Sequence, residues 1–540
     1  MLFGMGSMLV LAGLCFSIYW IQHHSVLVHS QSMEAPAKVV EGTALINGTA
    51  PIAQTDDDFI CATLDWWPPD KCDYGTCSWG RSTLLTLDLT NKILLSAIKA
   101  FSPLRVRMGG TLQDKVTYET QADDQTSCTP FTKNSSEFLG FSEGCLPMSR
   151  WDQLNAFFKQ TGAVVTFGLN ALYGRTISSD GSVIGVWNSS NAESLMQYTV
   201  NKGYSIHGWE LGNELSGNGV GARISAKQYA LDVNNLQNIA ENIYQGYEVK
   251  PLILAPGGFF DDSWFNDFIE RTTKTLQVVT HHIYNLGPDG EAQTFSGLKG
   301  ILKSSGTSAV AWVGEAGGAY NSGRNLVTNT FVFSFWYLDQ LGMSSTYDTK
   351  TYCRQTLIGG NYGLLDASTF LPNPDYYSAI LWHRLMGSTV LSTKFSGTNN
   401  IRAYSHCSKK SGGVTLLLIN LDGNTTVQVQ VSTEDVSSNG ALGLQQEGQS
   451  PRTKFTKVTS GKTTTEGHAR EEYHLTAKDG NLQSRTMLLN GKILSPNLDS
   501  SRKFIPSLEP ISVSLLDPIS VKPFSIMFAQ IPSMNVTAFK

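Results

Sequence analysis

Hydrophobic and polar positions follow two patterns along the chain, and the first extends from about residue 57 to residue 370. Short apolar runs there alternate with stretches of helical spacing such as Ser149–Gln160 and Ser225–Tyr244. Such alternation is typical of a parallel α/β fold, and eight units predict a (β/α)8 TIM barrel with its active site at the C-terminal strand ends. The predicted strands are Phe59–Leu64, Leu104–Met108, Ala163–Gly168, His207–Leu211, Leu252–Ala255, Val278–Ile283, Ala309–Val313 and Thr346–Cys353.

The second pattern begins at about residue 375 and continues to residue 540. Runs such as Gly413–Asn420 and Thr426–Val431 are separated by turns rich in Gly, Ser and Thr, which indicates antiparallel β-structure. The sequence therefore predicts a C-terminal β-sandwich domain, to which residues 36–55 add a strand. Residues 432–505 are polar and are predicted to form long exposed loops.

The N-terminal residues 1–30 have a pattern of their own. No charged side chain lies within Met1–Gln22, and Met8–Ile21 is almost wholly apolar. This segment is either a cleaved signal peptide or a retained membrane anchor, and both interpretations stay open. Either one sends the chain into the secretory pathway. Its destination would be the extracellular space or cell wall, the vacuole or lysosome, or the lumenal side of a membrane.

Cysteines and glycosylation sequons agree with that compartment. Five of the seven cysteines after Cys15 lie between residues 61 and 145, which predicts disulfides in the early loops, and the odd number predicts at least one free thiol. Cys72 and Cys77 could instead bind a metal, although no CxxC pair accompanies them. Five Asn-x-Ser/Thr sequons predict N-glycosylation at Asn47, Asn134, Asn188, Asn424 and Asn535.

Composition and charge narrow the class of protein. Charged residues make up 16% of the chain, against a usual share of about 25%. The net charge is −5, and the mean hydropathy is −0.12. These values exclude a polybasic nucleic-acid binder, a highly charged disordered chain and a protein with many membrane spans. A large enzyme with a well-filled core remains.

Two predicted strand ends carry the chemistry. Strand four runs into Asn213-Glu214, and strand seven runs into Gly314-Glu315. Cleavage of a glycosidic bond needs two carboxyl groups, and a retaining mechanism needs them about 5–5.5 Å apart. A lone Glu at a strand end could simply bind a backbone amide, but two on facing strands favour catalysis. Glu210, inside strand four, is interpreted as a buried structural partner.

Four further residues lie on predicted strands near these carboxyl groups. Tyr284 ends strand six and could donate a hydrogen bond to Glu315. The adjacent His281 and His282 could bind zinc, but no HExxH motif is present, so no metal is predicted. Arg107, on strand two, either lowers the pKa of Glu315 or forms an ordinary structural ion pair. The charge of Glu315 is expected to raise the pKa of Glu214.

Several segments together resemble glycoside hydrolase family 79, the heparanase-like β-glucuronidases. The resemblance extends from about Phe59 to Met386, and two later segments resemble the plant heparanase-like members. It is densest in Phe167–Tyr173, Trp187–Ala192 and Lys202–Glu214, and the later segments are Arg470–Thr476 and Asn481–Gly491.

The resemblance implies a role for each matching residue. Glu214 matches the family's acid/base and Glu315 its nucleophile, and no cofactor is implied. The other matching positions are Asp65 and Asn213 at sugar hydroxyls, Thr111, His282 and Tyr284 elsewhere in the cleft, and Tyr320, Gln355 and Tyr362 around the uronate carboxylate.

Departures from the family pattern narrow the substrate. Mammalian heparanase binds its sulfated polymer through basic clusters beside the cleft, but here Pro147–Gly162 offers only Arg150 and Lys159, and Pro256–Ser263 is acidic and aromatic. Heparan sulfate is therefore not the expected substrate. The linker that is excised from mammalian heparanase is not evident, so a single chain is expected. The loop Tyr320–Gly323 lacks the family's paired glycines, which puts its carboxylate contacts in question.

The sequence thus predicts a secreted, retaining exo-β-glucuronidase. Its expected partner is a carbohydrate with terminal glucuronic acid, either a glycan of arabinogalactan-type glycoproteins and proteoglycans or a small glucuronide; no nucleic-acid partner is expected. Three alternatives remain open: a glycosidase of other sugar specificity on the same scaffold, an endo-β-glucuronidase, and a catalytically silent glycan-binding protein. Membrane association would depend on residues 1–30.

Overall fold

The computed structural model describes residues 38–120, 128–284, 288–410, 412–433, 469–496, 507–532 and 534, with the side chains of 288–291 left out. The predicted signal or anchor segment 1–30, Cys15 and the sequon at Asn535 lie outside the described residues. Within those residues, no helix has the length and apolar character needed to cross a bilayer.

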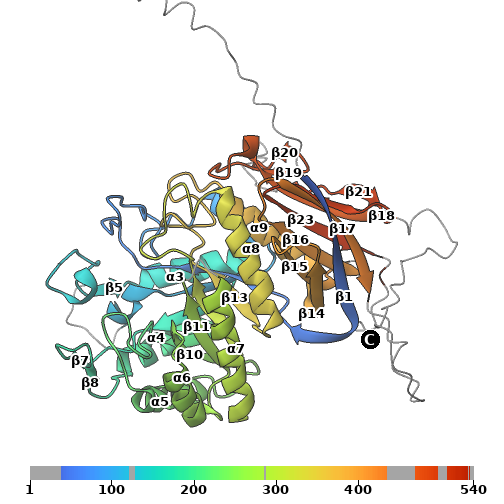
Figure 1. Cartoon of the computed structure of the whole chain (residues 1–540). Coiled ribbons are helices and arrows are strands. Elements are labelled where there is room, and N and C mark those ends of the chain that lie inside the picture. Colours follow the sequence, from blue (N-terminus) through green and yellow to red (C-terminus); the bar gives the residue numbers. More distant parts are fainter. Residues whose placement is uncertain are drawn as a thin grey trace, which may run out of the picture.

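Eight parallel strands close into a barrel, as predicted (Figure 1). Neighbouring strands around the barrel are β10-β11-β12-β13-β2-β3-β6-β9, and side chains of each are buried because helices cover the outside. Their bounds are β2 Ile60–Leu64, β3 Arg105–Met108, β6 Val164–Leu169, β9 Gly208–Leu211, β10 Leu252–Phe259, β11 Val278–Ile283, β12 Val310–Ala316 and β13 Thr351–Arg354.

Two strand boundaries differ from the prediction by more than three residues. The last strand was predicted from Thr346, but helix α8 (Phe331–Thr346) includes that residue and β13 begins at Thr351. The helix continues this far because its apolar residues recur every three to four positions and are buried. Strand β10 was predicted to stop before Pro256, yet it runs on to Phe259 and carries the chain further toward the active-site end of the barrel.

Helices follow most of the strands and surround the barrel (Figure 1). Helix α5 illustrates why they form, because Tyr229, Val233, Leu236 and Ala240 repeat at helical spacing and are buried. The α-helices are α2 Lys92–Lys99, α3 Met148–Thr161, α4 Ser190–Asn201, α5 Ala226–Ile243, α6 Asp262–Thr272, α7 Pro288–Ser305, α8 Phe331–Thr346 and α9 Pro374–Leu385. Short elements at the barrel end are η1 Thr111–Lys115, η2 Phe138–Gly140, β4 Val116–Tyr118, β5 Gly144–Leu146, β7 Thr176–Ile177 and β8 Val183–Ile184.

An eleven-stranded sheet forms the second part of the structure. Its order is β20-β19-β18-β23-β16-β15-β14-β1-β17-β22, with β21 beside β18. Strand β1 is antiparallel to β14 but parallel to β17, so the sheet is mixed. The strands are β1 Lys38–Gln54, β14 Met386–Ser396, β15 Ile401–Ser408, β16 Val414–Asn420, β17 Thr425–Thr433, β18 Ala469–Ala477, β19 Met487–Leu489, β20 Lys492–Ile493, β21 Ile511–Ser514, β22 Ile519–Val521 and β23 Ser525–Ile531. A short 3-10 turn, η5 Lys478–Gly480, follows β18.

The prediction of exposed loops throughout 432–505 was wrong for part of that range. Residues 469–477 form the buried strand β18, in which Tyr473, Leu475 and Ala477 face inward at every second position. That alternation is the period of a strand, and it was obscured by the polar residues between them. Residues 434–468 and 497–506 lie outside the described residues.

The sheet and the barrel share a hydrophobic core. Successive residues of β16 point to opposite faces, so that Leu416 and Leu418 pack inside the sheet domain, whereas Leu417 and Ile419 belong to the core that includes the barrel. Helices α8 and α9 lie between the two parts (Figure 1). The sheet therefore fixes the outer surface of the barrel near β12 and β13.

The predicted early disulfides are present. Cys72 is bonded to Cys77 and Cys128 to Cys145. The third bond joins Cys61 on β2 to Cys353 on β13, two neighbouring strands that lie 292 residues apart in sequence. Cys407 is a buried free thiol, as the odd count predicted. The sequon residues Asn134, Asn188 and Asn424 are exposed and Asn47 is half-buried, and their glycosylation stays a prediction.

Candidate active site

Glu214 lies just beyond the end of β9, in a backbone conformation that few L residues adopt. Its φ is 56°, and Gly212 before it has a φ of 68°. Two hydrogen bonds hold the turn: the Glu214 amide donates to the Gly257 carbonyl at 2.7 Å, and its carbonyl accepts from Val220 at 2.8 Å. Because a left-handed L residue is unfavourable by about 1–2 kcal/mol, these contacts fix where the carboxyl group points.

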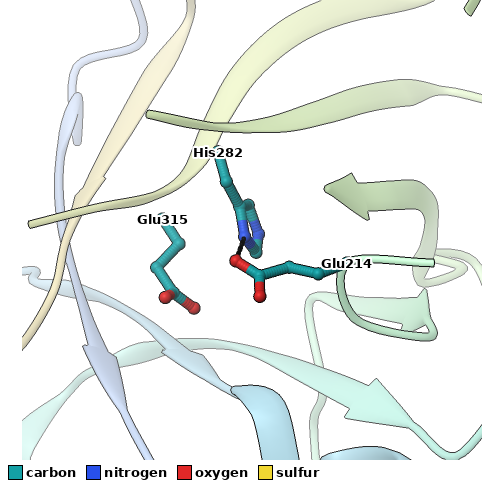
Figure 2. Close-up of side chains that lie close together, drawn as sticks. All are labelled: Glu214, His282 and Glu315. Atoms are coloured by element: carbon teal, nitrogen blue, oxygen red, sulfur yellow. Dashed lines mark hydrogen bonds and ion pairs between the residues drawn. The ribbon is translucent and has the colours of Figure 1, made fainter. Parts of the chain in front are cut away.

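Glu315 lies on β12 and faces Glu214 across the end of the barrel (Figure 2). One carboxylate oxygen of Glu214, one of Glu315 and one ring nitrogen of His282 all lie within 4.8 Å of one another. The Glu315 carboxylate accepts a hydrogen bond from Arg107 Nη1 at 2.9 Å and another from the Tyr284 hydroxyl at 2.5 Å. The contact between Tyr284 and Glu315 was predicted from the sequence.

The two carboxyl groups have different surroundings. The Glu214 carboxyl group has one side-chain hydrogen bond within the described part of the chain, to the His282 ring, with Oε1 2.9 Å from Nδ1. Burial raises the pKa of Glu214 to about 7, and the charge of Arg107 offsets this only in part. The sequence prediction attributed this shift to the charge of Glu315, and that attribution was wrong, because loss of hydration is the dominant cause. Burial also lowers the pKa of His282 to about 4, so its ring is neutral near pH 7.

Arg107 connects the residues of the site. Its guanidinium is 2% exposed and donates to Glu210 from Nε at 2.5 Å, to Glu315 from Nη1 and to Asn213 from Nη2 at 2.9 Å. Arg107 forms a buried ion pair with Glu210, which agrees with the structural interpretation, and it also contacts the Glu315 carboxylate; the other interpretation stays a prediction. Glu210 is buried against it, in agreement with the structural role predicted for that residue.

Asp114 lies at the site and was not predicted from the sequence. Its carboxylate accepts from the amides of Ala171 at 2.7 Å and Asn213 at 2.8 Å, and it thereby ties η1 to the turn that presents Glu214. Burial raises the pKa of Asp114 to about 7. One sequence signal was available: Asp114 lies three residues after the Gly109-Gly110-Thr111 cluster that ends strand two, at the end of the barrel where the active site is expected.

A second wall of the site contains three of the predicted substrate-binding residues. Gln355 donates to Asp65 from Nε2 at 2.8 Å and to the Tyr362 hydroxyl at 3.5 Å. Gly110 has a φ of 139°, and a β-carbon there would lie 2.5 Å from the Asp65 carboxyl group. Burial, followed by the charge of Glu315, raises the pKa of Asp65 to about 7.

Two buried nitrogen atoms next to Glu214 and Arg107 have no hydrogen-bond partner among the described residues. They are Nδ2 of Asn213 and Nε2 of His282. Buried polar atoms are nearly always paired, so these two are suited to contact substrate hydroxyls. Thr111, by contrast, is half-buried at the start of η1, and in the described part of the chain its side chain joins none of these contacts.

Three aromatic rings stand at the rim. Tyr320 stacks on Tyr284 with ring centres 5.3 Å apart and an interplanar angle of 13°, and Phe259 is tilted against both rings. Tyr320 is 56% exposed. The Tyr284 hydroxyl donates to Glu315, so the exposed Tyr320 ring is one residue removed from the Glu315 carboxylate.

The loop Tyr320–Gly323 adopts a glycine-like conformation without the paired glycines. Asn321 has a φ of 50° and Ser322 a φ of 65°. Asn tolerates this region, but Ser gives no such signal in sequence. Neither amide donates to a protein acceptor within the described residues. The left-handed backbone is therefore present without the paired glycines, and contacts of this loop with a substrate carboxylate stay a prediction.

Of the two basic residues in Pro147–Gly162, Lys159 is exposed and Arg150 is engaged by the fold. The Arg150 guanidinium donates to the carbonyls of Leu84 at 2.8 Å and Leu87 at 2.7 Å, so it is occupied by the fold. On the other side, Asp261 caps α6 by accepting from the Trp264 amide, and Asp262 follows it.

Glu214, His282 and Glu315 are also a possible set of metal ligands. However, Arg107 already supplies a positive charge to Glu315 at 2.9 Å, and two facing carboxyl groups are what a retaining glycosidase requires. The absence of a metal from the mechanism stays a prediction.

Comparisons with known proteins agree with this geometry. The profile described as glycosyl hydrolase family 79, N-terminal domain, matches residues 41–342. Heparanase-like protein 3 of Arabidopsis thaliana is 53% identical, with 92% of this chain and 94% of that protein covered. Baicalin-beta-D-glucuronidase of Scutellaria baicalensis is 44% identical, with 89% of this chain and 90% of that protein covered.

Solved structures with the same fold are more distant in sequence. A GH51 α-L-arabinofuranosidase from Thermotoga petrophila superposes with a TM-score of 0.61 at 12% identity, covering 91% of this chain and 100% of that one. A 4-O-α-L-rhamnosyl-β-D-glucuronidase from Fusarium oxysporum gives a TM-score of 0.57 at 15% identity, covering 90% and 100%. At identities this low, the superpositions support a shared fold of barrel and adjoining sheet and nothing beyond it.

Proposed function

The chain belongs to glycoside hydrolase family 79, and from this premise we propose that it is a retaining exo-β-glucuronidase. In this proposal Glu214 is the acid/base and Glu315 is the nucleophile. The observation that carries it is the pair of facing carboxyl groups, with an oxygen of each within 4.8 Å. That upper limit is compatible with the about 5–5.5 Å of retaining enzymes and lies below the about 6.5–9.5 Å that leaves room for the water of inverting ones.

Each carboxyl group has the surroundings that its role requires. Glu315 accepts hydrogen bonds from a cation and a phenol, which suit a carboxylate that attacks the anomeric carbon. Glu214, with a pKa of about 7, can hold a proton near neutral pH and give it to the leaving oxygen. Once the glycosyl ester on Glu315 has formed, ionised Glu214 takes a proton from water, which then releases the sugar.

The glucuronate specificity rests on groups that donate hydrogen bonds without a free cation. The amides of Asn321 and Ser322 have no protein acceptor among the described residues, and the Tyr362 hydroxyl lies near Gln355 on the adjoining wall. Such donors can hold a carboxylate. The relative at 44% identity is named as a glucuronidase, which supports the same sugar here.

The substrate class follows from the flanks. Asp261 and Asp262 would repel a sulfated polymer, and Arg150 is engaged by backbone carbonyls. We therefore propose terminal glucuronic acid on arabinogalactan-type glycans or on small aglycones as the substrate, and the name of the Scutellaria relative supports the second kind. Disulfides among the described residues support a secretory-pathway location, which is part of the proposal.

The decisive experiment compares p-nitrophenyl β-glucuronide with the matching glucoside, galactoside and xyloside. We expect turnover of the glucuronide, and we expect Glu315→Gln to reduce it by at least about a thousandfold because the nucleophile is lost. The matched control is Glu143→Gln, which changes an exposed Glu and should leave turnover intact.

Two outcomes would overturn parts of the proposal. Hydrolysis of the other glycosides but not of the glucuronide would refute the sugar specificity. Proton NMR during the first turnovers should show β-glucuronic acid, and initial release of the α-anomer would exclude Glu315 as nucleophile.

A further inference from the structure

A small disulfide-bonded loop follows β2, close to the active-site end of the barrel. Cys72 and Cys77 are bonded across it, and Asp73 and Thr76 exchange backbone hydrogen bonds of 2.9 and 3.0 Å inside it. We call residues 71–77 the cystine loop. Its two cysteines are exposed, but Asp73 points inward, with its side chain only 13% exposed.

Asp73 contacts the loop Tyr320–Gly323, which lies 249 residues further along the chain. The Ser322 hydroxyl donates to the Asp73 carboxylate and accepts from Trp79 Nε1 at 2.9 Å. Lys71 Nζ lies 3.0 Å from the other oxygen of Asp73. The carboxylate therefore has a fixed position, and the Ser322 side chain is held from two sides.

Ser322 needs this support because of its backbone. With a φ of 65° it is one of two consecutive L residues in the left-handed region, and such conformations persist only where the surroundings impose them. The third contact is the Ser322 carbonyl, which accepts from the Asn361 amide at 2.6 Å. A glycine at this position would need no such contacts, since it enters the left-handed region freely.

A second contact joins the same two loops. The Arg324 guanidinium lies 4.7 Å from the centre of the Tyr74 ring, at the tip of the cystine loop. The cystine loop thus packs along residues 322–324. Its effect on the site passes through the backbone of Asn321 and Ser322, whose amides donate to no acceptor among the described residues and are the proposed donors to the uronate.

We propose that Asp73, presented by the cystine loop, is a positioning residue that holds the Ser322 backbone in its left-handed conformation and so sets the affinity for the substrate carboxylate. This inference rests on the proposed glucuronidase function. It assigns no chemical step to Asp73, which acts through Ser322.

Asp73→Ala removes the acceptor and tests the inference directly. We expect the KM for p-nitrophenyl β-glucuronide to rise about tenfold, as for the loss of a hydrogen bond to a charged group. We expect kcat to stay within about twofold, because Glu214 and Glu315 are untouched. Free glucuronic acid as a competitive inhibitor should show the same rise in Ki. A merely structural role would lower the amount of folded enzyme and would leave KM unchanged.

Matched variants separate positioning from charge and from folding. Asp70→Ala removes the same charge from an exposed residue next to the cystine loop, and its KM should equal that of the wild type. Asp73→Asn keeps an acceptor oxygen and should restore most of the affinity. Ser322→Ala breaks the same hydrogen bond from the other side, and it carries the test if Asp73→Ala does not fold.

A double-mutant cycle gives the sharpest outcome. Because Asp73 acts through the Ser322 hydroxyl, Asp73→Ala combined with Ser322→Ala should raise KM no further than either change alone. The cystine-loop variant Cys72→Ser/Cys77→Ser should also raise KM, with kcat retained.

Two different results refute the two proposals separately. If the wild type does not hydrolyse the glucuronide, the proposed function fails. If the wild type is active but Asp73→Ala and Ser322→Ala keep its KM and Ki, or if their effects simply add, the positioning inference fails alone.

Discussion

At the scale of single residues, Arg107 determines how three acidic or amide side chains are held at the centre of the barrel. It is 2% exposed, and so is bound in place by Glu210, Asn213 and Glu315 rather than by water. A buried ion pair that loses one partner leaves an uncompensated charge. Arg107 is therefore expected to matter both for folding and for the chemistry.

Replacing Arg107 by Met should lower the free energy of unfolding by about 3–5 kcal/mol, because Glu210 and Glu315 would remain buried without a cation. We also expect kcat/KM to fall by about 100-fold or more, since a preorganised donor at the reacting carboxylate is lost. Urea unfolding and steady-state kinetics measure the two effects. Arg223→Met is the control, because its ion pair with Asp180 is exposed; an equal loss in both variants would contradict this account.

The pKa of Glu214 predicts the pH dependence of activity. Burial raises it from 4.5 to about 7, and the acid must be protonated to assist the leaving group. Activity is therefore present below the raised pKa and is lost as pH rises through it. We expect kcat/KM to fall about tenfold per pH unit above pH 7. A profile that stays flat to pH 9, with the fold intact by circular dichroism, would refute the assigned acid.

At the scale of elements, two of the disulfides are expected to affect different properties, one the stability of the fold and the other the affinity for substrate. Cys61–Cys353 ties neighbouring barrel strands across 292 residues, whereas Cys72–Cys77 spans five. Cross-linking a long segment restricts the unfolded chain more than cross-linking a short one. The first bond should therefore matter mainly for stability, and the second for the position of Ser322.

Cys61→Ala/Cys353→Ala should lower the free energy of unfolding by about 2–5 kcal/mol, and Cys72→Ala/Cys77→Ala should lower it clearly less. The KM for the glucuronide should rise more in Cys72→Ala/Cys77→Ala than in Cys61→Ala/Cys353→Ala. Thermal unfolding and kinetics on the two variants check this contrast. Equal losses of stability would show that the length of the closed segment does not determine the stabilisation here.

The elements also show what the sequence could predict. All eight barrel strands were found from apolar runs, and Glu214 and Glu315 from acidic residues at two strand ends. Asp114 was missed because a buried carboxylate that accepts hydrogen bonds from two backbone amides leaves no periodic pattern in the sequence. Ser322 was missed because left-handed backbone at a non-glycine residue depends on Asp73 and Trp79, which lie far away in sequence.

At the scale of the whole molecule, the shared core predicts that barrel and sheet unfold together. Leu416 and Leu417 are neighbours on β16 and both are fully buried, but only Leu417 packs in the core that includes the barrel. Many other residues of β23 and α8 join the two parts in the same way. Damage to either face of β16 should therefore reach the active site.

Leu416→Ala and Leu417→Ala should each lower the free energy of unfolding by about 2–5 kcal/mol. Calorimetry should show one transition in both variants, and activity should be lost on heating along with it. Two separate transitions would contradict this expectation. If Leu416→Ala shifted only one of them, and the enzyme stayed active after that transition, the sheet would unfold on its own.

Strand β1 imposes an order on the synthesis of this chain. It comprises Lys38–Gln54, yet its partners are β14, which begins at Met386, and β17, which ends at Thr433. At a ribosomal rate of about 5–20 residues per second, this strand must wait about 20–75 s for both neighbours to be made. Until β14 is made, Ala44 and Ile46, which are fully buried in the finished sheet, have no partner strand, and they stay without β17 until Thr433. The nascent chain therefore offers chaperones an incompletely paired apolar segment until about four-fifths of this sequence has been translated.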